Sequence, residues 1–249
     1  MLYVAVALGV FAVAFLLGSI PWGVIISKTV YHTDIREHGS GNIGTTNAMR
    51  TMGKSGGAAV FLLDFGKGLA SGALAMVAAN LLLPDAGLAA DALVSRDLLL
   101  AISAMGCTWG HIFSPWLGFH GGKGIAVAIG ALCFTFGPVG AIVEVFVIFA
   151  PLVLITRYVS VGSIASAALC PVIAAVLFWG EWPVIAVYAL TGLRWYGLIV
   201  PILRVWRPAR VSHRLQEGKG RPGRRIDLFR RFRMRFRDCD ACGFGSAAA

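Results

Sequence analysis

A succession of long apolar runs constrains this chain more than any other feature. One run covers residues 2–27, and others cover residues 56–83, 98–113, 159–179 and 184–203. A helix that crosses a bilayer needs about 20 apolar residues, so each run is a candidate membrane span. The 249 residues are 57% hydrophobic and only 14% charged, with a mean hydropathy of +0.77. This composition excludes an ordinary soluble domain and predicts an all-α, polytopic membrane helix bundle.

The region between Lys123 and Arg157 adds two helices to this prediction. It is apolar, but Gly137 and Pro138 interrupt it and Pro151 lies near its end. Glycine and proline both end helices, so we expect two short helices here and about seven membrane helices in all. Five full spans with a re-entrant pair is the alternative. Because no basic segment precedes the first run, we expect a retained span there rather than a signal peptide.

The distribution of Lys and Arg among the loops predicts which side each loop faces. The loops after the odd-numbered spans hold most of the loop cations: Lys28, Arg36, Arg50, Lys54, Lys123 and Arg157. The loops around residues 84–97 and 181 hold four acids and one cation, Arg96. Cytoplasmic loops of membrane proteins carry the excess of Lys and Arg. We therefore predict that the N-terminus lies outside and the C-terminus in the cytoplasm.

The last part of the chain differs in composition from the rest. Residues 204–237 contain 13 Lys or Arg and two acids, a net charge of +11, whereas the remaining residues sum to −1. We therefore divide the chain into a membrane-embedded domain, 1–203, and a basic, partly disordered cytoplasmic tail, 204–249. Basic residues beside a membrane attract anionic lipids, so we expect lipid contact and no nucleic-acid partner. Cys239 and Cys242 lack a second pair of ligands, so we expect no metal or redox role there.

Two glycine-rich loops lie on the predicted cytoplasmic side. The first contains Gly39-Ser40-Gly41-Asn42-Ile43-Gly44 and continues through Asn47 to Arg50. Glycines let successive backbone amides converge on one point, and such a concavity binds anions. A helix that begins near Thr45 would place Arg50 near its positive end, where both would hold the same anion. A plain flexible loop is the alternative interpretation.

The second loop contains Gly121-Gly122-Lys123-Gly124 and directly precedes the apolar run over residues 125–131. The amides at a helix N-terminus together with one Lys form a phosphate-binding site. The spacing is not that of a Walker A loop. A tight turn with a Lys that reaches the membrane surface is the alternative. His111 and His120 flank this loop, and either is a candidate acid or base.

Some polar residues lie within the apolar runs or at their ends. Asp64 and Lys67 are three residues apart and so share a helix face. They either pair with each other or line the anion site, and both interpretations stay open. Glu144 has no evident partner in the sequence. Ser160 and Ser163 begin a helix at the same predicted face, as caps or as phosphate ligands.

Several motifs follow one another along the chain: Gly18-Ser19-Ile20-Pro21-Trp22-Gly23, Asp34-Ile35-Arg36, Thr46-Asn47-Ala48-Met49-Arg50, Asp64-Phe65-Gly66-Lys67-Gly68, Gly110-His111-Ile112-Phe113 and Gly121-Gly122-Lys123-Gly124. In this order they resemble one bacterial family, the acyl-phosphate:glycerol-3-phosphate acyltransferases (PlsY family). The resemblance runs from about Gly18 to Ser163.

The resemblance implies an enzyme of the bacterial inner membrane with its active site at the cytoplasmic face. It would transfer a fatty acyl group from acyl phosphate to the 1-position of glycerol 3-phosphate, giving lysophosphatidic acid and phosphate for phospholipid biosynthesis. Members of the family use no cofactor and no metal. The partners would be the two substrates and membrane lipids, and the sequence predicts no particular oligomeric state.

The resemblance also assigns the site residues. The predicted catalytic residues are Ser40, Arg50, Lys123 and Ser163. The predicted substrate-binding residues are Gly39, Gly41, Asn42, Asn47, Asp64, Lys67, His111, Gly121, Gly122, Gly124 and Ser160.

The chain departs from the family in the last motif, which approximately reads His-Arg-x-Asn-x-x-Arg-Leu-x-x-Gly-x-Glu. Pro208, Val211 and Gly220 stand where the family has His, Asn and Glu. Two alternatives to the acyltransferase are therefore kept. One is a transporter or channel for a phosphorylated solute, and the other is a catalytically weakened paralog with a binding role.

Overall fold

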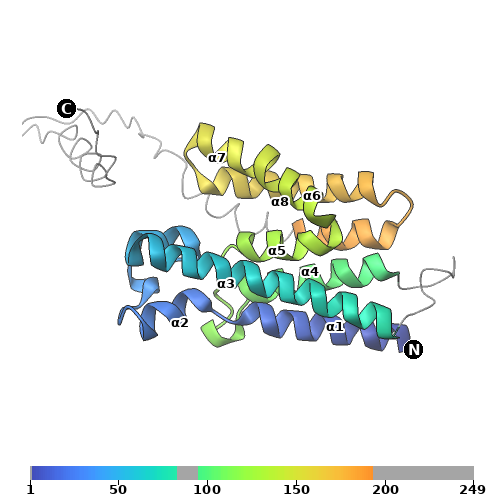
Figure 1. Ribbon diagram of the computed structural model, residues 1–249, viewed down its shortest axis with the longest axis horizontal. Coiled ribbons are helices and arrows are strands. Elements are labelled where there is room, and N and C mark those ends of the chain that lie inside the picture. Colours follow the sequence, from blue (N-terminus) through green and yellow to red (C-terminus); the bar gives the residue numbers. More distant parts are fainter. Residues whose placement is uncertain (1, 83–94, 193–249) are drawn as a thin grey trace, which may run out of the picture. The chain divides into compact units, whose positions relative to one another are not determined.

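The computed structural model describes residues 2–82 and 95–192 of the chain (Figure 1). Every regular element in these residues is a helix, which confirms the predicted all-α class. The elements are α1 (Leu2–Ser19), α2 (Trp22–Thr29), η1 (Ile35–Glu37), α3 (Thr45–Leu82), α4 (Arg96–Ile112), η2 (Pro115–Leu117), α5 (Ile125–Thr135), α6 (Gly137–Val143), η3 (Glu144–Phe149), α7 (Ala150–Thr156) and α8 (Val159–Leu177). A further helix covers Trp182–Gly192.

Seven apolar helical runs are present in the described part of the chain, in agreement with the predicted number. Four are long and apolar enough to cross a membrane: Tyr3–Thr29, Thr45–Leu82, Arg96–Leu117 and Val139–Thr156. Three are shorter: Ile125–Thr135, Val161–Leu177 and Trp182–Gly192. The predicted boundary between membrane domain and tail, at residues 203 and 204, lies outside the described residues.

The first apolar run is broken between α1 and α2, although the sequence predicted a single span over residues 2–27. Pro21 has no N–H to donate and disfavours helical backbone in the residue before it. Two distant side chains bind the carbonyl groups at this break: Ser114 Oγ donates to Ser19 O at 2.7 Å and Lys67 Nζ donates to Ile20 O at 2.8 Å. Irregular backbone at membrane depth is tolerated where protein groups satisfy it in this way.

A helix begins at Thr45, as predicted, whereas the second apolar run began only at residue 56. Within α3, Gly53 has a non-helical backbone (φ 75°, ψ −173°) and divides the element into residues 45–52 and residues 54–82. Part of the segment expected to be a polar loop is therefore helical. Arg50 lies on this short helical segment rather than on an irregular loop.

The apolar region from α5 to α7 breaks once, at the predicted position. Gly137 has φ 72°, and α5 ends just before it after 11 residues. The next three elements, α6, η3 and α7, continue into one run over Val139–Thr156 that is long enough to span. Pro151 lies in the first turn of α7, where proline is tolerated, and does not break this run. Of the two helices predicted to be short, only α5 is short.

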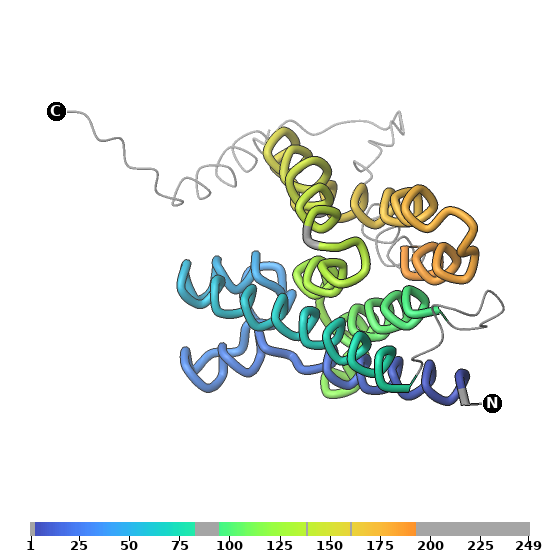
Figure 2. Tube along the Cα trace, turned by 45° about the vertical axis from the view of Figure 1, so that its right-hand side comes forward, coloured from blue at the N-terminus to red at the C-terminus, as the bar shows by residue number. Residues whose placement is uncertain are grey.

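The most extensive helix contacts are those of α1 with α4 and of α3 with α5. Glycines allow these close approaches, because a side chain at Gly110 would collide with the carbonyl of Phe15 and one at Gly130 with that of Phe65. Helix α5 lies between the group formed by α1, α3 and α4 and the segment from α6 to α8 (Figures 1 and 2). The second glycine-rich loop leads directly into this central helix.

Two of the acidic segments predicted to share one side meet in the structure. Ser95 caps α4 by accepting a hydrogen bond from the Leu98 amide at 3.0 Å. The same hydroxyl donates to Glu181 Oε2 at 2.9 Å. The start of α4 and the turn before Trp182 therefore lie together, in agreement with the predicted alternation of the spans.

Candidate active site

Asn47 holds the first glycine-rich loop in one shape. Its side chain is 2% exposed. The amide nitrogen Nδ2 lies within hydrogen-bond distance of the carbonyls of Ile35 (2.9 Å), His38 (3.0 Å) and Asn42 (2.9 Å). The amide oxygen Oδ1 accepts from the Ser40 backbone N–H at 2.9 Å. Both polar atoms of this side chain therefore bind the backbone of the loop, which is formed before any ligand arrives.

The glycines of this loop are required by its conformation and by Asn47. Gly39 has φ 59°, and a Cβ there would collide with Asn47 Oδ1. Gly41 has φ 67°, also in the left-handed region that favours glycine. Asn42 Oδ1 accepts from the Gly44 amide at 2.9 Å and turns the chain into the helix that starts at Thr45. The Asn47 backbone amide donates to the Gly44 carbonyl at 3.1 Å, so the amides of Thr45 and Thr46 are the ones that a ligand at this helix start could bind.

Of the four cations between the first two apolar runs, Lys28 and Arg36 are paired with an acid, whereas Arg50 and Lys54 form no ion pair with a described residue. Arg36 donates to both oxygens of Asp34, at 2.9 and 2.6 Å, and Lys28 Nζ lies 3.1 Å from the same carboxylate. The hydrogen bond from Arg36 is the main reason that the pKa of Asp34 lies well below its usual value. Arg50 is exposed and forms no ion pair within the described residues. Arg50 is therefore a cation that this loop can offer to a ligand, and unlike Lys54 it lies before the break at Gly53, on the short helical segment that follows the loop.

The second loop is fastened to the end of α4 through its backbone. Gly121 N donates to the Ile112 carbonyl at 2.9 Å, and Gly122 N donates to the His111 carbonyl at 3.1 Å. Both amides are thus occupied. The amides that remain for an anion are those at the start of α5, which follows Gly124.

Asp64, Lys67 and His111 form a buried cluster beneath this loop. They are 2%, 4% and 3% exposed. Lys67 Nζ lies 2.9 Å from Asp64 Oδ1, 2.9 Å from His111 Nδ1 and 2.8 Å from the Ile20 carbonyl. An ammonium group has three N–H donors, and two of them serve the hydrogen bonds to the Ile20 carbonyl and His111 Nδ1, while Asp64 is held by the ion pair. The pairing of Asp64 with Lys67, one of the two interpretations left open by the sequence, is therefore observed.

The same cluster fixes the orientation of the His111 ring. Because the Lys67 ammonium can only donate, His111 Nδ1 must accept, and the neutral ring carries its hydrogen on Nε2. A Cβ at Gly122 would collide with His111 Nε2, so this nitrogen faces the backbone of the second loop. The buried cluster thus supports the loop from below through His111.

The second loop is also tied to the break between α1 and α2. Ser114 Oγ donates to the Ser19 carbonyl, and Trp116 Nε1 donates to Ser19 Oγ at 2.8 Å. With Lys67 bound to the Ile20 carbonyl, the break joins α3, α4 and η2 at one place. Ser19, Ile20 and Trp116 were not among the site residues predicted from the sequence. Pro21 could have indicated them, because a proline within an apolar run marks a helix break, and the backbone carbonyls at such a break need polar partners.

Arg50 and Lys123 bring the two loops into electrostatic contact. Burial and, second, the positive charge of Arg50 lower the pKa of Lys123. This effect indicates that the two side chains lie close enough for their charges to interact. Two adjacent cations repel each other unless an anion lies between them. Their proximity beside two helix N-termini is therefore typical of a phosphate site.

Other predicted residues are not connected to this centre by any described interaction. Ser163 is buried near the start of α8, and its hydroxyl donates to the Val159 carbonyl at 2.6 Å. Ser160 lies in the first turn of α8, and its side chain is outside the described part. Their roles stay predictions. The altered last motif (Pro208, Val211 and Gly220) and the pair Cys239 and Cys242 also lie outside the described residues.

Comparison with protein families and curated proteins gives consistent matches. The family model described as glycerol-3-phosphate acyltransferase matches residues 8–217. The glycerol-3-phosphate acyltransferase of Thermosynechococcus vestitus is 35% identical over 218 residues, which are 86% of this chain and 94% of that protein. The enzyme of the same name from Halalkalibacterium halodurans is 35% identical over 206 residues, 82% and 89% of the two chains.

Two solved structures share the fold. They are crystal structures of PlsY (YgiH), an integral membrane glycerol 3-phosphate acyltransferase, in the glycerol 3-phosphate form and in the lysphosphatidic acid form. The TM-scores are 0.65 and 0.63, and both are 30% identical to this chain. Each similarity covers 80% of this chain, and 90% and 91% of the solved chains.

Proposed function

This chain belongs to the glycerol-3-phosphate acyltransferase family, and we propose that its acyl donor is acyl phosphate and its active site the meeting point of the two glycine-rich loops. It is an integral membrane enzyme that acylates glycerol 3-phosphate in phospholipid biosynthesis. The related PlsY has been solved in a glycerol 3-phosphate form and a lysphosphatidic acid form, which supports these as acceptor and product. The acyl group would enter at the 1-position.

The proximity of Arg50 and Lys123 carries the assignment of the site. Both substrates of the proposed reaction are phosphate esters or anhydrides, and the reaction releases a phosphate. A centre that must hold two anions side by side needs two cations and two sets of backbone donors. The helix starts at Thr45 and Ile125 supply the donors, and Arg50 and Lys123 supply the charge.

The proposed reaction is an acyl transfer between oxygens. The 1-hydroxyl oxygen of glycerol 3-phosphate forms a bond to the carbonyl carbon of acyl phosphate, and the bond from that carbon to the phosphate oxygen breaks. The hydroxyl proton leaves with the released phosphate, which is basic enough to accept it. Lys123 and Arg50 stabilise the negative charge on the carbonyl oxygen and the leaving phosphate. Because acyl phosphate is already activated, holding both substrates in place supplies much of the rate.

The other predicted residues differ in the contacts that they make. Ser40 has an exposed hydroxyl on the first loop, and we assign it to direct contact with substrate. Gly39, Gly41, Asn42 and Asn47 shape that loop. Asp64, Lys67 and His111 support the second loop, and Ser163 is retained as a catalytic residue on the family motif alone.

We further propose that both loops face the cytoplasm of a bacterial inner membrane. The excess of Lys and Arg in the loops on this side supports it. Glycerol 3-phosphate is a polar metabolite, so a site at the cytoplasmic surface has direct access to it. The acyl chain of the donor would lie among the apolar helices.

The deciding experiment uses the full chain, purified and reconstituted in lipid, with acyl phosphate and labelled glycerol 3-phosphate. We expect labelled lysophosphatidic acid to form without coenzyme A, acyl carrier protein or added metal. Lys123→Ala removes one stabilising charge and should lower kcat about 100- to 1000-fold. Ser40→Ala should also lower kcat strongly.

Lys54→Ala is the matched control, because Lys54 is exposed on the same side but lies outside the proposed centre. It should leave the rate within about twofold of wild type. Full activity of Lys123→Ala would refute the site. No transfer by wild type, under conditions where a relative with the complete last motif works, would refute the donor assignment and favour the weakened paralog.

A further inference from the structure

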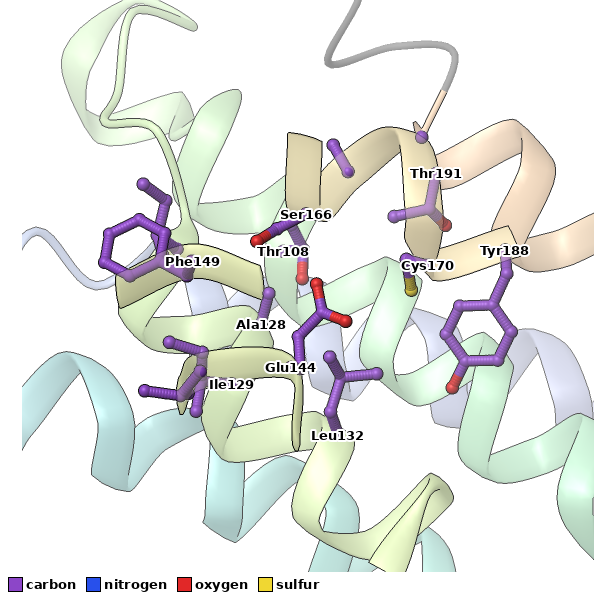
Figure 3. A pocket seen from close by; sticks show the side chains of 14 residues that line it. Thr108, Ala128, Ile129, Leu132, Glu144, Phe149, Ser166, Cys170, Tyr188 and Thr191 are labelled. Atoms are coloured by element: carbon purple, nitrogen blue, oxygen red, sulfur yellow. The ribbon is translucent and has the colours of Figure 1, made fainter. Parts of the chain in front are cut away.

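An apolar pocket lies along one face of α5, separate from the loop residues assigned to phosphate binding. Ile125, Ala128, Ile129 and Leu132 line it, at positions i, i+3, i+4 and i+7 of the helix (Figure 3). These positions advance roughly 10 Å along the helix axis, at 1.5 Å per residue. The pocket thus extends from the first residue of α5 into the apolar part of the protein.

One end of this pocket adjoins the second glycine-rich loop. Ile125 is two residues after Lys123, and Thr108, which also lines the pocket, packs against Gly124. Thr108 lies about one turn before His111 on α4. The pocket therefore begins where the proposed reaction takes place.

Glu144 places a carboxyl group inside this otherwise apolar space. Its side chain is 3% exposed, and the carboxyl points into the pocket between Leu132 and Ser166 (Figure 3). Glu144 is the first residue of η3, a π-helical segment, and such segments are frequent at functional sites. Among the described residues that line the pocket, none is a Lys, Arg or His. Within the described part of the chain, the carboxyl therefore has no cationic partner.

Hydrogen-bonding atoms without a partner occur in and next to this pocket. Seven buried side-chain polar atoms in the described residues lack a hydrogen-bond partner, and four belong to this region: Thr135 Oγ1, Glu144 Oε2, Ser166 Oγ and Tyr188 OH. The Ser166 hydroxyl neighbours the carboxyl, and the Thr135 hydroxyl neighbours Tyr188, but the geometry of neither pair makes a good hydrogen bond. Buried polar groups in proteins nearly always have partners, so this cluster indicates a ligand.

We propose that this pocket takes the acyl chain of the donor and that Glu144, with Ser166 and Tyr188, selects chains that carry a hydroxyl group. The proposal rests on the proposed acyl-phosphate reaction, which puts an apolar chain at the mouth of the pocket. A carboxyl in an apolar site is least costly in its neutral form, which can both donate and accept a hydrogen bond. A hydroxyl on the acyl chain could accept a hydrogen bond from this carboxyl and donate one to it. An unsubstituted chain leaves these polar groups without a partner.

The expected preference for a hydroxylated chain is the effect of one or two hydrogen bonds on kcat/KM. We expect kcat/KM for the best hydroxyacyl phosphate to exceed that for the unsubstituted chain about tenfold, which corresponds to about 1.4 kcal/mol. The hydroxyl should be effective only in the middle of the chain, because the carboxyl lies within the pocket rather than at its mouth.

The experiment compares acyl phosphates of equal length with a hydroxyl at successive carbons, using full-length wild type and two variants. Glu144→Gln keeps hydrogen-bonding groups and should keep a preference for the hydroxylated chain. Glu144→Leu removes them, so its ratio of kcat/KM values should fall about tenfold while the unsubstituted chain still reacts. Phe146→Leu is the control, because Phe146 lies on the same π-helical segment but is exposed and does not line the pocket.

A second measurement covers the case in which Glu144→Leu does not fold. Dicyclohexylcarbodiimide reacts with neutral carboxyl groups in apolar surroundings, and mass spectrometry locates the adduct. Modification of Glu144 in wild type should be slowed more by the hydroxyacyl phosphate than by the unsubstituted one.

The outcomes separate this proposal from the proposed function. Equal ratios in wild type and Glu144→Leu at every hydroxyl position, with active enzyme, overturn the proposal and leave the acyltransferase assignment intact. Failure of every acyl phosphate to react overturns the donor assignment instead. Equal protection of Glu144 by the two chains, or no modification of Glu144 at all, also overturns the selection proposed here.

Discussion

Asn47 and Lys123 illustrate two ways in which a single polar residue serves this site. Both polar atoms of the Asn47 side chain bind backbone groups of the loop and its flanks, so this residue contributes the shape of the loop. Lys123 contributes charge, at a position where Arg50 adds a second positive charge. Phosphate binding needs both a preformed arrangement of donors and net positive charge. The sequence identified both residues but did not separate these roles.

At this scale the charge of Lys123 leads to a prediction about pH. Burial and Arg50 lower the pKa of Lys123 below the usual value of 10.5, so the lysine loses its charge at a lower pH than an ordinary lysine. If the charged form is the active one, kcat should fall as the pH rises through this lowered pKa. Arg50→Gln removes one cause of the shift, so the alkaline limb of the profile should move to higher pH. Lys123→Arg stays charged and should abolish the limb.

The profile is measured with reconstituted enzyme after subtraction of the spontaneous hydrolysis of acyl phosphate. Lys54→Arg is the control for the chemical change from lysine to arginine and should leave the profile as in wild type. An alkaline limb that persists unchanged in Lys123→Arg would show that another group titrates.

The helices of this protein are joined at the site by polar contacts that cross from one element to another. Lys67 of α3 binds Asp64 of its own helix, His111 of α4 and the Ile20 carbonyl between α1 and α2. One ammonium group thus connects three elements at the place where backbone groups would otherwise be unsatisfied within the membrane. The arrangement explains why an apolar helix carries two charged residues three positions apart.

At the scale of these elements we predict that removing one member of the ion pair lowers the free energy of unfolding more than replacing both members by apolar residues. Lys67→Met leaves Asp64 buried without its partner and should lower the free energy of unfolding by about 3–5 kcal/mol. The double change Asp64→Leu with Lys67→Met removes both charges and should cost less than the single change. The free energies are measured by denaturant unfolding in mixed micelles.

Ser71→Ala is a useful reference in that series, because Ser71 lies one turn further along α3 and joins α4 through neutral hydrogen bonds with Ser103. It should cost about 1 kcal/mol. A Lys67→Met variant no less stable than Ser71→Ala would contradict the interpretation of the cluster as a buried ion pair.

The whole molecule brings polar segments together from distant parts of the chain. Ser95 at the start of α4 binds Glu181, and Arg50 of the first glycine-rich loop acts electrostatically on Lys123 of the second. Both relationships agree with spans that alternate in direction. The excess of Lys and Arg in the glycine-rich loops predicts that these loops are the cytoplasmic ones.

Cysteine labelling tests this orientation. In a background without native cysteines that retains transfer activity, Ser40→Cys should react with a membrane-impermeant maleimide only after the cells are opened. Trp179→Cys, at the exposed turn after α8, should react in intact cells once the outer barrier is permeable. The reverse pattern would place the active site on the outer side. Labelling of both from the same side would contradict the alternation of spans.

The sequence by itself determined the class of fold and most of the chemistry. Apolar runs separated by basic and acidic loops are sufficient to predict a helical membrane protein, because each span satisfies its own backbone hydrogen bonds. The glycines, Asn47, Arg50 and Lys123 were identifiable because anion binding draws on few residue types, arranged close together along the chain. The resemblance to the family then indicated the two substrates.

The tertiary structure alone decided which of these groups meet. The break at Pro21, the triple contact of Lys67 and the proximity of Arg50 to Lys123 join residues that are far apart in sequence. The pocket around Glu144 likewise depends on α4, α5, η3, α8 and the helix over Trp182–Gly192 at once. Local sequence fixes hydrogen bonds within a helix or a loop, but burial and charge pairing between helices depend on how their faces pack.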